Sequence, residues 1–456
     1  MNQTFTIRCI ISKRCQLMCI VLSLFSLLSL TTGCLSQQAA TKTTDNSKKQ
    51  ALSAETAAGT VGYETPEILK ASEILPPELI EGENYNVNED ILTYGFTNYY
   101  TIMSPVGIFE AEGDDMLRIR IHEIKAIGAL HDIKKSKAFG EAAQKAATSS
   151  VKGALSLISH PVNTVSGVPK GIGKLFSRVS EMAKGARGDS EESVAKELIG
   201  FSAVKRQYAY KMGVDVYSSN EVLQRELNSV SWAGFAGGGG ISLATRAVKG
   251  ASKLAYFSIK GTKFIYGMNK ILLDNAPEDL RRINREKLLQ MGIKNTVIEE
   301  FLRNPNFSPR HETILVHALS KMEGVRNRDK FIRQALFAES ELDALVFQQI
   351  AEMLYGYHTQ VGPISEIIPL RRIAVGYTAD QAVVIALPTD YIYWTERTSL
   401  GLGAVTQLQS TERTVKRTEL WLTGRLTPRA RKEIEETGVI VNERIGERLM
   451  PPSTQE

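Results

Sequence analysis

Two short polar patterns contain residue types used in acyl transfer. Ser149 precedes Lys152 by three positions, and Ser218-Ser219-Asn220 follows further along the chain. A serine hydroxyl attacks an ester or amide when a neighbouring group removes its proton, and lysine is one such group. Catalysis would require the fold to bring both patterns into one site.

The S-x-x-K and S-x-N patterns together resemble the acyl-serine enzymes of the penicillin-binding and β-lactamase class. The resemblance implies Ser149 as the nucleophile and Lys152 as its base. The third element of that class, K-T-G on a strand, is missing, since Leu422-Thr423-Gly424 lacks the lysine and Lys260-Gly261-Thr262 has the wrong order. We therefore interpret these side chains as solvated helix residues. A serine hydrolase of cell-wall or lipid ester bonds remains an alternative.

Patterns for phosphate and metal binding are incomplete. The glycine-rich segment 167–174 has five residues where a P-loop has four, and Leu175 stands where the loop needs Ser or Thr. His311-Glu312 and His317 place their histidines six apart, not the four apart of a zinc-binding H-E-x-x-H helix. We expect polar positions on an exposed helix there, and neither a metal nor a cofactor.

The four cysteines all lie near the start of the chain, at positions 9, 15, 19 and 34. The rest of the sequence therefore has no disulfide framework, no cysteine-ligated zinc site and no cysteine nucleophile. Arg8, Lys13 and Arg14 precede the uncharged, mostly apolar run 17–30, which has the length of a signal-peptide core.

The run ends at Gly33-Cys34, which resembles the lipobox of bacterial lipoproteins. The resemblance implies removal of residues 1–33 and lipidation of Cys34, although Thr31 stands where the family usually has Leu. An ordinary secretory signal cleaved elsewhere is the alternative. Leu35 after the cysteine implies outer-membrane sorting in a Gram-negative cell. Cleavage would lower the formal net charge from +5 to +2, so the charge gives no reason to expect nucleic-acid binding.

The remaining sequence divides by composition, and its fold class is predicted to be α+β. Residues 34–62 are polar and form a flexible tether in this interpretation. The predicted regions that follow are an acidic, mostly β segment (63–130), a basic Gly/Ala-rich helical region (131–273), a helical bundle (274–360) and a mixed α/β region (361–456).

The acidic segment is predicted to form a small antiparallel sheet with one solvated face. Residues 92–103 and 107–111 are rich in Tyr, Phe, Thr and Ile, and apolar residues alternate with Arg and His over 117–122. This places His122 on a strand, with no partner that the sequence identifies.

The basic region contains a predicted amphipathic helix over 168–182, with Lys170, Lys174 and Arg178 on one face. Such a helix either contacts an anionic membrane surface or packs inside the protein against the acidic segment. The run Gly237-Gly238-Gly239-Gly240 is costly in a helix. It predicts a hinge, a close backbone crossing or a loop around a ligand.

The last two regions carry clear helix and strand signals. Ser308-Pro309 predicts a helix start and Gly324 its end. Short apolar runs at 373–377, 382–387 and 391–395 predict strands. Thr427-Pro428 predicts a helix between two parallel strands at 419–423 and 439–441.

These features together predict a lipid-anchored protein of a bacterial envelope, non-enzymatic, that binds an envelope protein, glycan or lipid partner. A membrane-perturbing protein that uses its basic and Gly-rich segments is a second alternative.

Overall fold

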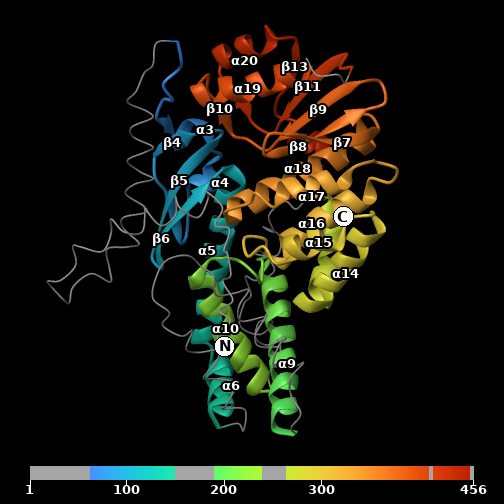
Figure 1. Ribbon diagram of the computed structural model, residues 1–456. Helices are drawn as coiled ribbons and strands as arrows, with labels where there is room; N and C mark the ends of the chain where they lie inside the picture. Colours follow the sequence, from blue (N-terminus) through green and yellow to red (C-terminus); the bar gives the residue numbers. More distant parts are fainter. Residues whose placement is uncertain (1–61, 149–188, 239–262, 410–413, 452–456) are drawn as a thin grey trace, which may run out of the picture. The chain divides into compact units, whose positions relative to one another are not determined.

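The computed structural model describes residues 62–148, 189–238, 263–409 and 414–451. It contains helices and strands in separate regions: an antiparallel sheet first, helices centrally and a mixed sheet last (Figure 1). The α+β prediction is therefore confirmed. The predicted tether up to residue 61 and the basic helix 168–182 lie outside the described residues.

The first sheet has six strands, and all its pairings are antiparallel, as predicted. Its strands are β1 (Leu69–Lys70), β2 (Glu81–Gly82), β3 (Tyr85–Val87), β4 (Asp90–Tyr94), β5 (Thr97–Ser104) and β6 (Gly107–Glu112), with short helices α3 (Ala71–Ile74) and α4 (Pro77–Ile80). Every second residue of β5 is buried from Asn98 to Ile102, which gives the expected alternation of faces.

The strand predicted over 117–122 is wrong, because this stretch lies inside helix α5 (Asp114–Lys135). Its buried residues include Leu117, Ile121, Ile124 and Ile127, which follow a helical period. The period-two alternation is confined to six residues, and the longer helical pattern prevails. His122 therefore lies on a helix.

The predicted helical region is confirmed where it is described, with α6 (Lys137–Thr148), α9 (Asp189–Met212), α10 (Glu221–Ala236) and α13 (Lys263–Asp274). Residues 213–220 form the connection between α9 and α10. Leu223, Leu227 and Val230 of α10 are buried in a core shared with α5 and α9.

A helical bundle follows, with α14 (Pro277–Gln290), α15 (Asn295–Leu302), α16 (Pro309–Lys321), α17 (Arg328–Ala335) and α18 (Glu341–Gln360). The predicted start of α16 is confirmed, because the Ser308 hydroxyl accepts a hydrogen bond from His311 N at 3.2 Å and Pro309 occupies the first turn.

The last sheet has the order β13-β11-β9-β8-β7 and packs on α18 through the largest hydrophobic core. Its strands are β7 (Ile364–Leu370), β8 (Ile373–Thr378), β9 (Ala382–Leu387), β11 (Arg417–Leu422) and β13 (Val439–Asn442). A short parallel pair, β10 (Tyr391–Ile392) and β12 (Arg425–Leu426), lies beside helix α19 (Glu396–Gln409). Strands β11 and β13 are parallel and joined through α20 (Pro428–Glu435), as predicted; α21 (Gly446–Leu449) follows.

Candidate functional site

Most of the predicted site residues lie outside the described part of the chain. These are Cys34, Ser149, Lys152, Lys170, Lys174, Arg178, Gly239 and Gly240. Lipidation of Cys34, catalysis by Ser149 and Lys152, and membrane contact by the basic helix therefore stay predictions. The downstream S-x-N pattern, His122 and the first two glycines of the run are described.

Gly237 closes the C-terminal end of α10 where it meets α6. A Cβ atom at this position would lie 2.3 Å from the carbonyl oxygen of Ala142 and 2.4 Å from that of Ala233. Gly238 has a φ of +69°, in the left-handed region that favours glycine. Gly237 therefore lies at a close approach of α10 to α6, and the hinge role of the glycine run stays a prediction.

The serine and asparagine of the S-x-N pattern bind a buried carboxylate on α5. The Ser218 hydroxyl donates a hydrogen bond to one oxygen of Glu123, and Asn220 Nδ2 donates to the other at 2.9 Å. Arg120 Nη1 donates to the same second oxygen at 2.8 Å. Glu123 is only 2% exposed, so these donors replace the water it loses.

The same cluster continues to the start of α18. Arg120 Nη2 donates to the Ser219 hydroxyl at 3.0 Å and to Glu341 Oε2 at 3.2 Å. The Ser219 hydroxyl also donates to Glu341. We call Arg120, Glu123, Ser218, Ser219, Asn220 and Glu341 the Glu123 network. It links α5, the 213–220 connection and α18, and it was missed from the sequence because Arg120 and Glu341 are 221 positions apart.

His311, Glu312 and His317 are buried, so the expected exposed helix is wrong. Burial lowers the pKa of His317 to about 4, and Thr313 O lies 2.9 Å from its Nδ1. Burial also lowers the pKa of His311 to about 4, and it raises the pKa of Glu312 to about 8. Helix α16 is buried on several sides, because it packs against both α14 and α18.

Asp215, in the 213–220 connection, lies close to the Glu123 network. Burial raises its pKa to about 6, with Arg310 and the amide of Tyr217 acting in the opposite direction. That amide donates to Asp215 Oδ1 at 2.9 Å. Glu341 and Glu123 raise the pKa further by repulsion. An acid that titrates near neutral pH is a common feature of functional sites.

The described residues contain no group of three or more His, Cys, Asp or Glu able to hold a metal ion. His122 Nε2 lies 2.8 Å from the carbonyl oxygen of Met212. This contact ties α5 to the end of α9.

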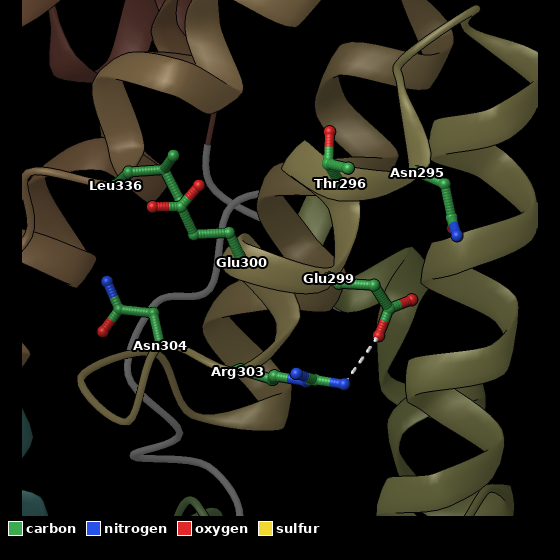
Figure 2. Close-up of a pocket in the computed structure, with 7 residues that line it drawn as sticks. All are labelled: Asn295, Thr296, Glu299, Glu300, Arg303, Asn304 and Leu336. Atoms are coloured by element: carbon green, nitrogen blue, oxygen red, sulfur yellow. Dashed lines mark ion pairs between the residues drawn. The ribbon is translucent and has the colours of Figure 1, made fainter. Parts of the chain in front are cut away.

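An open depression of about 660 Å³ lies beside α15, and Figure 2 shows the side chains that line it. All but one of its lining residues are of polar or charged types, and they are Asn295, Thr296, Glu299, Glu300, Arg303, Asn304 and Leu336. Arg303 Nη2 lies 3.7 Å from Glu299 Oε2, and Arg285 pairs with the same carboxylate. The depression offers amide, hydroxyl and charged groups to a polar partner, and its lining has no serine, cysteine or histidine.

The sequence matches no known family model, and no curated protein or solved structure is significantly similar to it. Across the described residues, no helix is both long and apolar enough to span a membrane.

Proposed function

We propose that this protein is a lipid-anchored component of a bacterial envelope, with a non-enzymatic binding or structural role. The observation that carries the proposal is Gly33-Cys34 at the end of the uncharged run 17–30. That arrangement places a lipidation signal before a polar segment and a folded body. Outer-membrane sorting is part of the proposal if the cell is Gram-negative.

The start of the described body supports a tethered arrangement. Arg429 donates a hydrogen bond to the carbonyl oxygen of Gly62. Glu64 Oε2 accepts from Trp394 N at 2.5 Å and from the Thr427 hydroxyl at 2.6 Å. Residues 62–64 are therefore hydrogen-bonded to the last region of the fold. The proposed tether thus ends at a fixed point on the folded body.

The Glu123 network supports a structural role for the S-x-N pattern. The Ser218 hydroxyl donates a hydrogen bond to Glu123 and accepts one from the backbone amide of Asn220 at 3.1 Å. Arg120 and Asn220 donate to the other oxygen of Glu123, so both carboxylate oxygens are engaged in hydrogen bonds within the fold. The depression beside α15 is our candidate for partner binding, because it presents amide, hydroxyl and charged side chains in a hollow at the surface.

Membrane fractionation of a Cys34→Ala variant tests the anchor. We expect the parent protein to stay with membranes in high salt and Cys34→Ala to be released. Cys19→Ala is the matched control, because in the proposed protein Cys19 belongs to the signal peptide that is cleaved off before Cys34. A Cys34→Ala protein that remains membrane-bound in high salt would contradict lipid anchoring. It would also direct attention to the basic helix 168–182.

A further inference from the structure

The end of the predicted tether meets the fold beside β10 and β12. The Tyr63 ring lies 6.5 Å from the Trp394 ring, and Glu64 N donates to Trp394 O at 2.8 Å. Thr427, which binds Glu64, in turn donates its amide to Ile392 O at 2.9 Å. The surface around these short strands is therefore the part of the fold that the anchored chain reaches first.

Two arginines on this surface lie against aromatic rings. The Arg397 guanidinium is 5.8 Å from the ring centres of both Tyr94 and Phe96, and that of Arg425 is 4.8 Å from the ring centre of Tyr391. Asp390 N donates a hydrogen bond to Phe96 O at 2.9 Å. Because Phe96 contacts Arg397 and Asp390 directly precedes Tyr391, this bond brings the two arginine-aromatic groups close together. We call Tyr94, Phe96, Tyr391, Arg397 and Arg425 the arginine-aromatic surface.

Both guanidinium groups have unused hydrogen-bonding capacity. Neither one forms an ion pair or side-chain hydrogen bond with the described residues, Arg397 is exposed, and Tyr94 is 39% exposed. Arginine binds phosphate oxygens with its planar fork, and tyrosine is enriched at the membrane-water interface. Arginine with tyrosine at the end of a lipid-anchored tether fits a layer of phospholipid headgroups.

We propose that the arginine-aromatic surface contacts phospholipid headgroups when the protein is held by Cys34. This inference rests on the lipid anchor of the proposed function. Glu396 is exposed on α19 next to Arg397, and Glu67 is exposed in the segment before β1, so the net attraction to an anionic surface is small. The tether compensates by keeping the surface at a high effective concentration near the membrane. The contact therefore orients a protein that the lipid already holds.

Site-specific quenching in vesicles tests the contact. The lipidated protein is placed in phosphatidylcholine and phosphatidylglycerol vesicles that contain a lipid with a nitroxide on its headgroup. A fluorophore is attached at Glu396→Cys, next to Arg397, or at Glu286→Cys on α14, where the side chain is 56% exposed. The absence of cysteine after position 34 makes both labels specific.

We expect the label at 396 to lose fluorescence and the label at 286 to keep it. The loss at 396 should disappear in Arg397→Gln/Arg425→Gln and persist in Arg282→Gln/Arg333→Gln, which removes two exposed arginines elsewhere. Equal quenching at the two positions, or quenching at 396 that survives the first double variant, overturns the proposal. The mass of the N-terminal peptide reports lipidation separately, so an absent lipid would overturn the proposed function and this inference with it.

Discussion

Asp390 caps helix α5 from a part of the chain 276 residues away. Its Oδ1 accepts a hydrogen bond from the amide of Asp114 at 3.1 Å, and its Oδ2 accepts from the amide of Asn98 at 2.7 Å. The residue before the helix is Gly113, which has no side chain to do this. A carboxylate at a helix N-terminus also interacts favourably with the helix dipole. One side chain thus joins the last region of the fold to β5 and α5.

Replacement of Asp390 by alanine is expected to lower the free energy of unfolding by about 1–2 kcal/mol, the usual cost of a lost helix cap. Asp390→Asn should cost less, because the amide keeps an oxygen that accepts a hydrogen bond. It also removes a buried carboxyl whose pKa is raised by burial and by repulsion from Asp114. Urea unfolding measures both variants. Equal stability of Asp390→Ala and the parent would show that the cap contributes nothing.

Asp215→Asn is expected to stabilise the protein near neutral pH. The folded pKa of about 6 is above the ordinary 3.8. The folded state therefore holds a proton that the unfolded chain releases, and this contribution to stability is lost as pH rises through 6. The variant should be more stable by about 3 kcal/mol at pH 7, and the difference should almost vanish at pH 4.

Urea unfolding at several pH values tests Asp215→Asn. Asp132→Asn is the control, since the Asp132 side chain is 65% exposed and pairs only with Lys135 in the described structure. A constant difference between Asp215→Asn and the parent across pH 4–7 would be inconsistent with a titrating Asp215.

His317→Gln is expected to flatten the loss of stability in acid. The folded pKa of about 4 is below the ordinary 6.5. The unfolded chain therefore takes up a proton that the folded protein excludes, and stability falls as pH decreases from 6.5 to 4, by about 3 kcal/mol for one such group. The slope of unfolding free energy against pH is the measurement, since the variant also loses packing at every pH. An unchanged slope would refute the assignment.

Three glycine-to-alanine substitutions should have different effects on stability. Gly237→Ala places a methyl group against the Ala142 carbonyl and should cost about 1–3 kcal/mol. Gly238→Ala meets open space but has a positive φ, and should cost about 1 kcal/mol. Gly140→Ala, inside α6 with open space around it, should stabilise by about 0.5–1 kcal/mol. Thermal unfolding ranks them, and equal effects at Gly237 and Gly140 would contradict the close approach.

Local signals predicted the parts of the fold that local chemistry determines. Ser308 and Thr427 are helix caps, as predicted. Strands β11 and β13 are parallel, as expected for two strands joined by a helix. Strand β7 was not predicted because it contains Glu366 and Pro369, both unusual in a strand. It lies at the edge of its sheet, where a proline is tolerated.

The Glu123 network could not be predicted, because its members come from three distant segments. The S-x-N pattern drew attention to Ser218 and Asn220, but the sequence does not show that their partner is Glu123. His311 and Glu312 seemed exposed because polar residues usually are. The packing of α16 between α14 and α18 buries them instead.

The bond between Glu64 and Thr427 joins residues 363 positions apart. During synthesis the first of these residues emerges long before the second, so the beginning of the body stays unpaired until almost the whole chain has been made. Closing so long a loop is slow and costs entropy. The start of the body is therefore fixed in the fold late, and in the lipid-anchored protein that we propose this step would take place close to the membrane surface.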